Sequence, residues 1–284
     1  MKANESVRRS RTEPERFRES PGETRACRQA VARGDYKNWM PRGMIYSFLG
    51  GMMLSLVLCL LLRHVKWLAI VLAVITVFFC LLTVWSILMY RAFSYDGKRR
   101  MSAQIIEGTA ARVKLPAGGK CLDVGCGSGA LAIAVAKRNP KASVIGIDRW
   151  GKEYASFSKA LCEQNAKAEG VRNTTFQQGD ATHLDFPDET FDAVVSNYVY
   201  HNIPGDRQAY LLETLRTLKK GGTFALHDIF SKSKYGDMQA FVRKLRDMGY
   251  QKVALIDTTD GMFMTPFEAR WMALSGSALL VGIK

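Results

Sequence analysis

Two long apolar stretches near the N-terminus constrain this chain more than any other feature. Residues 44–62 and 67–90 contain no charged side chain, and only residues 63–66 separate them. A helix rises about 1.5 Å per residue, so each stretch is long enough to cross a hydrocarbon core about 30 Å thick. The short connection includes two cations and a histidine, which are costly in lipid. We therefore predict a transmembrane helical hairpin over residues 44–90, with its turn at one membrane surface.

The basic residues beside the hairpin predict its orientation. Those before and after it are Arg33, Lys37 and Arg42, then Arg91, Lys98, Arg99 and Arg100. The turn carries only two cations, and the flank with more cations stays in the cytosol. We therefore expect a multi-pass protein of the cell membrane whose termini and remaining domain are cytoplasmic. The alternative is a pair of core helices in a soluble protein, which the length and the missing polar face of both stretches argue against.

Composition indicates which partners the chain favours. The formal net charge is +14, from 40 Lys and Arg against 26 Asp and Glu, and a basic protein attracts acidic lipid or nucleic acid. Because basic segments adjoin the predicted spans, we expect the lipid bilayer as partner and disfavour nucleic acid. None of the six cysteines forms a CxxC pair or a zinc-type spacing with histidine, so the sequence predicts reduced thiols and no metal site.

The rest of the chain divides into three further regions. Residues 1–43 are rich in Arg, Glu, Ser and Pro and lack apolar periodicity, so we predict a disordered basic segment. Its last part contains Tyr36 and Trp39, which suit a membrane interface. Residues 91–119 are expected to form a juxtamembrane linker and a leading helix, and residues 120–284 a globular domain.

In that domain, strand-like and helix-like segments alternate. The predicted strands are residues 120–124, 143–148, 174–178, 191–196, 223–228, 252–257 and 278–283. The predicted helices are residues 130–138, 153–169, 207–218 with Asp206 as cap, and 237–248. Such alternation predicts a parallel sheet covered by helices on both faces, with ligands bound at the carboxyl ends of its strands. No long helix fits between the last two strands, which permits antiparallel pairing there.

A glycine-rich turn follows the first predicted strand, in the sequence LDVGCGSG at residues 122–129. Glycine lets a backbone approach a ligand closely, but dinucleotide-binding folds use such turns as well. Two details favour another ligand. The spacing is G-x-G-x-G rather than G-x-G-x-x-G, and Asp123 stands two residues before the first glycine. A carboxylate there would repel a pyrophosphate and attract an ammonium, and S-adenosylmethionine carries an ammonium, a sulfonium and no phosphate.

Acidic residues after the next two strands extend this predicted cofactor site. Asp148 ends the second strand and can accept hydrogen bonds from ribose hydroxyls, which fits NAD equally well. Asp180 follows the third strand and can accept a hydrogen bond from an adenine amino group, or instead cap a helix. The predicted cofactor contacts are Asp123, Gly125, Cys126, Gly127, Gly129, Asp148, Arg149, Asp180, Ala181 and Asn197.

Five segments, taken in order, resemble one known family. They are LDVGCGSG at 122–129, GID at 146–148, GDA at 179–181, FDAVVSNYVYHNI at 191–203 and LKKGGTFALHDIF at 218–230. Over roughly residues 100–284 the chain resembles class I S-adenosylmethionine-dependent methyltransferases of the bacterial small-molecule type. The resemblance implies an α/β fold with a doubly wound, Rossmann-like seven-stranded sheet, an antiparallel last strand, and methyl transfer. Lys220 stands where many members have proline, which changes only the stiffness of a turn.

The segment after the fourth strand carries the main catalytic candidates. Methyl transfer from a sulfonium is an in-line displacement, in which a general base helps when the acceptor is a hydroxyl or an ammonium. His201 is the candidate base because an imidazole titrates near neutral pH, and Tyr200 lies beside it. His227 and Asp228, at the end of the fifth strand, are further candidates. The alternative is that these histidines only line the pocket. The segment lacks the Asn/Asp-Pro-Pro-Tyr/Phe box, which disfavours nucleobase and amide acceptors.

Two segments, residues 93–106 and 258–271, are available to roof an acceptor site. The second is apolar and is expected to close over an apolar acceptor, to touch the bilayer, or to pack on the sheet. The leading hypothesis is a membrane-anchored methyltransferase acting on a small or lipid-like acceptor at the cytosolic face. The alternatives are a membrane-tethered protein that binds S-adenosylmethionine without methyl transfer, an NAD-dependent oxidoreductase, and a nucleic-acid methyltransferase that uses the basic N-terminus.

Overall fold

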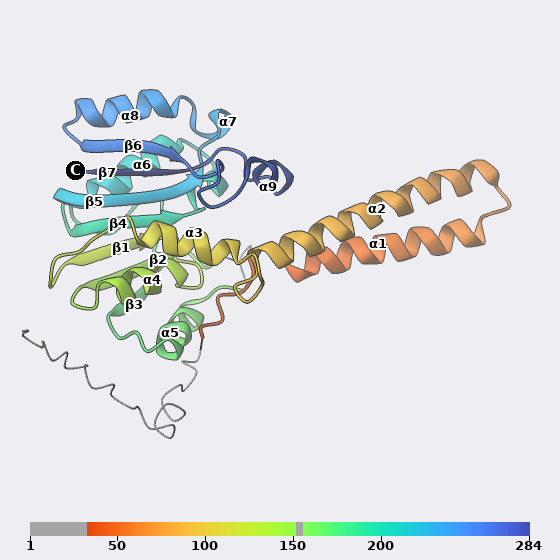
Figure 1. Ribbon diagram of the computed structural model, residues 1–284, viewed down its shortest axis with the longest axis horizontal. Helices are drawn as coiled ribbons and strands as arrows, with labels where there is room; N and C mark the ends of the chain where they lie inside the picture. Colours follow the sequence, from red (N-terminus) through yellow and green to blue (C-terminus); the bar gives the residue numbers. More distant parts are fainter. Residues whose placement is uncertain (1–32, 152–155) are drawn as a thin grey trace, which may run out of the picture. The chain divides into compact units, whose positions relative to one another are not determined.

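The structure, a computed structural model, describes residues 33–151 and 156–284. Its first two helices, α1 (Arg42–Leu61) and α2 (Lys66–Phe93), lie side by side (Figure 1). Both are long and apolar enough to cross a membrane, by length and composition. The two predicted apolar helices are therefore present, and α2 continues beyond the predicted end at Tyr90.

Small and polar residues line the contact between α1 and α2. The hydroxyl of Thr76 lies 2.9 Å from that of Ser55, and Ser55 is buried although its helix is largely exposed. A side chain on Gly51 would clash with the ring of Phe79, at 2.9 Å from the added Cβ. Large apolar side chains point outward along both helices. Small and polar residues at this contact let the two helix backbones approach closely.

Seven strands form one sheet in the order β3-β2-β1-β4-β5-β7-β6. They are β1 (Lys120–Val124), β2 (Ser143–Asp148), β3 (Thr174–Gln178), β4 (Phe191–Asn197), β5 (Leu218–Ile229), β6 (Gln251–Asp257) and β7 (Ser277–Ile283). β7 runs antiparallel to β5 and β6, and the other neighbouring pairs are parallel. The doubly wound seven-stranded sheet is confirmed, including its antiparallel last strand. Because the strand order reverses between β1 and β4, their carboxyl ends mark the expected ligand position.

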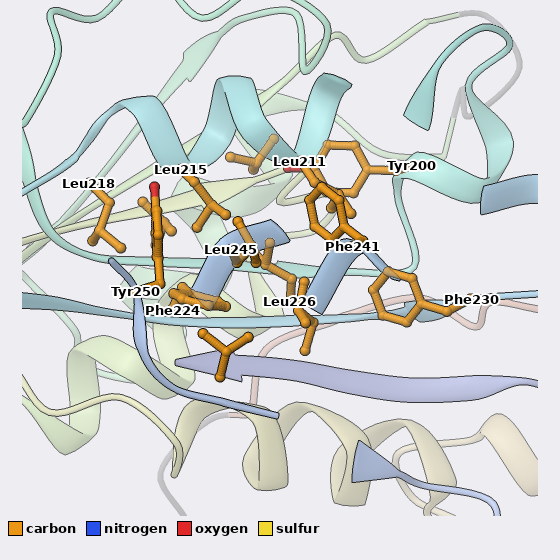
Figure 2. Close-up of a cluster of buried hydrophobic side chains, with 14 of the residues drawn as sticks. Tyr200, Leu211, Leu215, Leu218, Phe224, Leu226, Phe230, Phe241, Leu245 and Tyr250 are labelled. Carbon is orange, nitrogen blue, oxygen red and sulfur yellow. The ribbon is translucent and has the colours of Figure 1, made fainter. Parts of the chain in front are cut away.

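Helices cover both faces of the sheet. They are α3 (Met101–Ala110), α4 (Ala130–Arg138), α5 (Lys159–Ala168), the 3₁₀ helix η2 (Tyr200–Asn202), α6 (Arg207–Arg216), α7 (Lys232–Tyr235), α8 (Met238–Asp247) and α9 (Pro266–Trp271). Side chains of α3, α4 and α5 share one apolar core with β1 and β2. Figure 2 shows the second core, where Leu211 and Leu215 of α6 meet Phe241 and Leu245 of α8 over β5. Burial of both sheet faces explains why the central strands are almost continuously apolar.

Capping side chains explain where two helices begin. Asp206 accepts hydrogen bonds from two backbone N–H groups in the first turn of α6, which confirms the predicted cap. The helix predicted over residues 153–169 is wrong at its start. α5 begins only after Ser158, whose hydroxyl accepts a hydrogen bond from the backbone of Leu161 at 3.1 Å. Residues 153–155 lie outside the described part of the chain.

The fifth strand is longer than predicted. β5 begins at Leu218 rather than Thr223, and Leu218 pairs with Phe191 of β4. Both side chains are fully buried, so their packing extends the strand, and a register shift between Phe191 and Ala193 precedes the regular ladder. The predicted helix before it accordingly ends at Arg216.

The segment before α1 is ordered, so the predicted disorder of residues 1–43 is wrong for its described part. The Asn165 side chain of α5 accepts a hydrogen bond from the backbone N–H of Asp35 at 2.7 Å and donates to its carbonyl at 3.1 Å. Tyr36, the next residue, is buried in the core beside α5. Satisfied backbone groups and buried aromatic surface offset the entropy lost on ordering. The prediction for residues 1–32 lies outside the described residues.

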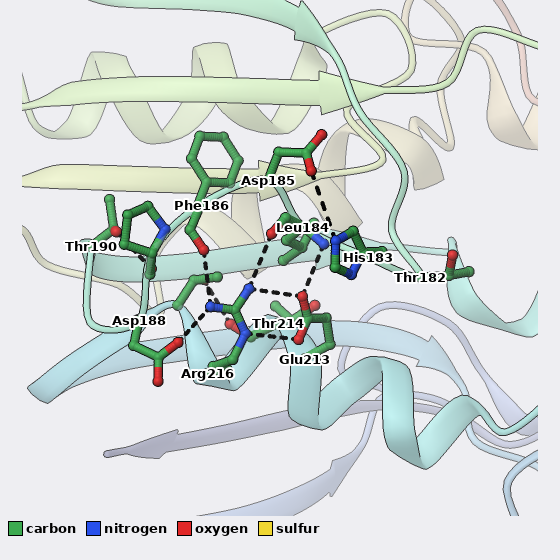
Figure 3. Close-up of polar contacts among 12 residues, drawn as sticks. Thr182, His183, Leu184, Asp185, Phe186, Asp188, Thr190, Glu213, Thr214 and Arg216 are labelled. Atoms are coloured by element: carbon green, nitrogen blue, oxygen red, sulfur yellow. Dashed lines mark hydrogen bonds and ion pairs between the residues drawn. The ribbon is translucent and has the colours of Figure 1, made fainter.

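One arginine organises the connection between β3 and β4. Arg216, at the end of α6, donates two hydrogen bonds of 2.8 Å to Glu213 and one of 2.6 Å to Asp188 (Figure 3). It also donates to the carbonyls of Leu184 and Phe186 at 3.0 and 2.9 Å. Hydrogen bonds from Arg216 lower the pKa of Glu213 to about 2. The network fixes the segment that follows the predicted adenine contact.

Candidate active site

The glycine-rich turn connects β1 to α4 and is held against β2. The backbone N–H groups of Gly125 and Cys126 donate to the carbonyl of Ile147 at 2.8 and 2.9 Å. Gly125 has a φ of +72°, and a Cβ added there would lie 2.3 Å from the side chain of Val199. Only glycine fits this position, so the turn packs directly against the segment that follows β4. Positive φ angles also occur at Gly127 and Gly129.

Asp123, one residue before the end of β1, is buried at 1% exposure. Its Oδ2 atom has no hydrogen-bond partner among the described residues. Burial raises the pKa of Asp123 to about 8, against an opposing hydrogen bond from the backbone of Ala132 and with a smaller rise caused by Asp148. A buried carboxylate oxygen without a partner is costly until a cation or donor satisfies it. This orphaned oxygen fits the ammonium group of S-adenosylmethionine.

Asp148, at the end of β2, is fixed against the same turn. Its two oxygens accept hydrogen bonds from the backbone of Gly127 at 2.9 Å and of Trp150 at 2.8 Å. The Trp150 indole N–H in turn donates to the carbonyl of Gly127 at 3.0 Å. Each carboxylate oxygen can accept more than one hydrogen bond, so ribose hydroxyls remain compatible with this arrangement. The ribose contact stays a prediction.

Asp180 and its neighbours follow β3. The Asp180 carboxylate accepts hydrogen bonds from the backbone and the hydroxyl of Thr182, both at 2.8 Å. These two bonds lower the pKa of Asp180, and the positive charge of Arg149 contributes further. Ala181 packs against the second core. The structure thus brings Arg149 near Asp180, while their contact with the adenine end of a cofactor stays a prediction.

His201 and Asp228 form a hydrogen-bonded pair at the carboxyl ends of β4 and β5. His201 Nδ1 lies 2.5 Å from Asp228 Oδ1, and the His201 side chain is 13% exposed. Asp228 is buried and also accepts hydrogen bonds from the backbone of Tyr200 at 2.9 Å and of Ile229 at 2.7 Å. A carboxylate at Nδ1 fixes the proton there and leaves Nε2 as the acceptor. The sequence offered Asp228 only as an alternative base, whereas its position assigns it to orient His201.

The structure places Tyr200, a predicted catalytic residue, inside the core. Its ring lies in the second core (Figure 2) and is 1% exposed. Its hydroxyl lies 2.5 Å from that of Thr214 on α6, and burial raises the pKa of Tyr200 far above its ordinary value. The short helix η2 turns Tyr200 inward and leaves its neighbour His201 with the accessible ring. This position favours a structural role for Tyr200, which anchors the segment to α6.

The position of His227, the second histidine predicted as a base, disfavours that role. Its Nδ1 lies 2.8 Å from Asn197 Oδ1 and its Nε2 lies 3.0 Å from Thr258 Oγ1, so both nitrogens have partners. Burial lowers the pKa of His227 to about 3, which keeps the ring neutral. His227 holds the Asn197 side chain at the end of β4, and the cofactor contact of Asn197 stays a prediction. Thr258 was not predicted, because its role depends on the distant β6–β7 connection.

The roof segment, residues 258–276, connects β6 to β7 and contains α9. The ring of Phe263 lies 5.5 Å from that of His227, centroid to centroid. Arg99, between α2 and α3, donates to both oxygens of Glu268 at 2.5 and 3.1 Å. The two segments predicted as alternative roofs are thus joined to each other beside the candidate site.

A third apolar cluster joins the roof segment to the base of the hairpin. Its buried members include Met40, Met89, Phe93, Met101, Ile105, Phe263, Met264 and Met272. The indole N–H of Trp85 in α2 donates to the carbonyl of Trp271 at 2.9 Å. Trp39 lies edge-on to Tyr198 at 5.6 Å, and Tyr198 lies 5.9 Å from His201. Ring contacts through Trp39 and Tyr198 therefore connect the apolar cluster at this end of the hairpin to His201, a connection that no sequence motif signals.

Comparison with known proteins identifies the family. Residues 115–259, just over half of the chain, match the family described as a methyltransferase domain. The chain belongs to the methyltransferase-domain family. S-adenosylmethionine is accordingly its cofactor, in agreement with the orphaned oxygen of Asp123 and the glycine turn that accepts no side chain.

The matches to individual relatives each span only part of the relative's length. Demethylmenaquinone methyltransferase of Lactobacillus johnsonii is 38% identical over 112 residues, which are 39% of this chain and 44% of that protein. The 27-O-demethylrifamycin SV methyltransferase of Amycolatopsis mediterranei is 29% identical over 155 residues, which are 55% of each protein. The chain thus spans about half the length of the curated relatives it matches.

Solved structures share the fold. Geranyl diphosphate methyltransferase, in complex with GPP and sinefungin, superposes with a TM-score of 0.52 at 14% identity, over 68% of this chain and 82% of that one. The cyclase SpnF superposes with a TM-score of 0.51 at 20% identity, over 66% and 82%. At these identities the likeness concerns the fold alone.

Proposed function

We propose that this protein is a membrane-anchored methyltransferase that uses S-adenosylmethionine and acts on a small or lipid-like acceptor at the cytosolic membrane face. The observation that carries the proposed chemistry is the pair formed by His201 and Asp228 beside the glycine turn. Val199, which lies two residues before His201, contacts Gly125. The candidate base and the glycine turn therefore belong to one packed unit.

The chain's own residues suit proton removal from a protic acceptor. Bound S-adenosylmethionine supplies a methyl group that is electrophilic without further activation. His201 takes the acceptor's proton at Nε2, and Asp228 at Nδ1 stabilises the resulting imidazolium. A hydroxyl acceptor gains most from such a base, because it becomes a strong nucleophile only as the proton leaves. Trp39 and Tyr198 limit the access of water beside this pair.

The names of the relatives support a small-molecule acceptor. One is named for demethylmenaquinone and another for 27-O-demethylrifamycin SV. The apolar cluster between the hairpin base and the roof segment supports an acceptor of similar, largely apolar character. We extend this acceptor class to the present chain as a proposal.

The length and composition of α1 and α2 support the membrane anchor. Exposed apolar side chains along both helices would be costly in water and are favourable in lipid. The excess of cations on the outer flanks of the hairpin supports a cytosolic catalytic domain.

The test uses full-length protein in lipid nanodiscs, with S-adenosylmethionine carrying an isotopically labelled methyl group and a membrane lipid extract as the source of acceptors. We expect labelled product, and we expect His201→Asn and Asp228→Asn to lower its formation about 10²–10⁴-fold without weakening cofactor binding. His183→Asn is the matched control, because the His183 side chain is 81% exposed.

Two results would contradict parts of this proposal. Wild-type turnover by His201→Asn at every pH would remove the base from the mechanism. Bound cofactor without product, for lipid and water-soluble extracts alike, would favour the tethered protein that binds S-adenosylmethionine without transferring its methyl group.

A further inference from the structure

The contact between α2 and α9 fixes where the roof segment lies along the axis of α2, and therefore at which membrane depth it would lie. Trp85, which donates to the carbonyl of Trp271, lies six residues before Arg91, the first charge after the apolar stretch of α2. Six helical residues cover about 9 Å. With α2 in a membrane and Arg91 among the headgroups, Trp85 lies at the edge of the hydrocarbon core, and α9 lies there with it.

A second contact indicates the same position for the membrane boundary. Arg42, at the start of α1, donates to the hydroxyl of Tyr90 in α2 at 2.8 Å, so both helices leave the apolar region at matching heights. Tyr46 lies one helical turn deeper than Arg42 and is 65% exposed. Tyrosine and tryptophan gather at membrane interfaces because their rings are apolar and their polar atoms reach water. Tyr46, Trp85 and Tyr90 all lie near this end of the two helices, and Trp85 contacts α9.

The roof segment divides its apolar side chains between two environments. Phe263 and Met264 are 6% and 1% exposed and belong to the cluster beside the site. Phe267, in the first turn of α9, is 71% exposed, and Met262 is 40% exposed. Burying a phenylalanine is worth about 1.5–3 kcal/mol, so an exposed one at the level of the interface would gain from contact with lipid.

Charge favours an acidic lipid surface at this place. The exposed cations at the end of α2, on the α2–α3 connection and on α9 are Arg91, Lys98, Arg100 and Arg270. The exposed acids of the connection and the roof segment are Asp96, which pairs with Arg33, and Asp260. Each cation near an anionic membrane surface contributes about 1 kcal/mol of attraction.

We infer that α9 is a second membrane contact, in which Phe267 enters the interfacial layer of a bilayer that carries anionic phospholipid. The inference rests on the proposed membrane insertion of α1 and α2. One short segment then meets lipid with its outer side chains and covers the site with Phe263 and Met264. The bilayer surface thereby becomes one wall of the region through which an acceptor reaches His201.

The test places a bimane fluorophore on the full-length protein in nanodiscs of phosphatidylcholine, with or without phosphatidylglycerol. Cys59 and Cys80, the cysteines that are not buried in the described part of the chain, are first replaced by serine, and Cys27 is replaced as well. Phe267→Cys then carries the probe, and Met248→Cys is the matched control, because Met248 is 54% exposed and lies at the opposite end of β6 from the roof segment. Lipids brominated near the headgroup should quench the probe at position 267 about twofold, since interfacial groups lie about 5–10 Å into the boundary layer, and leave position 248 unchanged. Phosphatidylglycerol should increase the quenching at 267.

A third sample separates this inference from the proposed anchor. It keeps the native Cys80, which is exposed on α2, and carries the probe there. Quenching at Cys80 by deeply brominated lipid, with position 267 no more quenched than position 248, would overturn the α9 contact and leave the anchor intact. An unquenched Cys80 would overturn the anchor, and the α9 contact with it.

Discussion

Cofactor binding should release a proton from Asp123. Without a ligand the pKa of this carboxyl is about 8, because it is buried and one oxygen has no partner. At pH 7 only about one-tenth of the molecules then carry the charge that pairs with an ammonium. Ionising the rest costs about 1.4 kcal/mol, which weakens binding roughly tenfold relative to a carboxyl that is already ionised.

The sign and size of the pH dependence follow from this value. Between pH 7 and pH 6 the ionised fraction falls a further tenfold, so the affinity for S-adenosylmethionine should fall roughly tenfold. Above about pH 8 the ligand's own α-amino group loses its proton, so affinity should decline again. Isothermal titration calorimetry in two buffers of different ionisation enthalpy measures both the affinity and the protons released. We expect close to one proton released per cofactor at pH 7.

Asp123→Asn is the informative variant, because the amide keeps the shape and removes the titration. It should bind the cofactor more weakly, by about 2–5 kcal/mol, with an affinity that no longer changes between pH 6 and 7. Since the folded pKa of Asp123 is raised, ionisation destabilises the ligand-free protein as pH rises toward 8, and the variant should lose that decline. Constant affinity of the wild type from pH 6 to 7, with no proton release, would refute the reasoning.

Three further predictions concern single residues. Gly125→Ala should abolish the thermal stabilisation that the cofactor gives and lower the free energy of unfolding by about 1–3 kcal/mol, because Gly125 has a positive φ and no room for a Cβ. A wild-type rise in melting temperature on adding the cofactor would contradict this. The pKa of Glu213 is lowered to about 2, so its pairing with Arg216 stabilises the fold above about pH 4.5, and this stabilisation is lost as pH falls toward 2. Glu213→Gln should lower the free energy of unfolding by about 1–2 kcal/mol in urea at pH 7 and should weaken the loss of stability in acid. Equal loss of stability in acid for the wild type and the variant would contradict this prediction. Tyr200→Phe should lose about 1 kcal/mol of stability and keep its turnover, and a large fall in turnover at unchanged folding would return Tyr200 to the chemistry.

Local sequence patterns predicted most of the fold. The spacing of apolar residues indicated the two long helices and the strands, and Asp206 marked the start of α6. The glycine spacing and Asp123 indicated a turn for a positively charged ligand, which agrees with the family match. These features can be predicted from the sequence because each depends on residues within a few positions of one another, where backbone geometry alone decides which residue types fit.

The sequence predicted only part of the candidate site. Tyr200 and His201 are neighbours in sequence, but η2 directs one ring into the core and leaves the other beside the cofactor turn. The role of Asp228 depends on β5 lying next to β4, which no property of either strand reveals alone. His227 has the right residue type at the right strand end, but its burial and its two hydrogen bonds, which the sequence does not reveal, disfavour a role as base.

The sequence by itself determined which segments are apolar, which turn is the candidate cofactor site and in which order strands and helices follow. Only the tertiary structure decided that His201 meets Asp228, and that Trp85 of α2 meets Trp271 of the roof segment across 186 positions of sequence. The physical reason is that helix and strand periods are set by neighbours along the chain. A contact between distant segments is set by which surfaces gain most from meeting, and that gain depends on the whole fold.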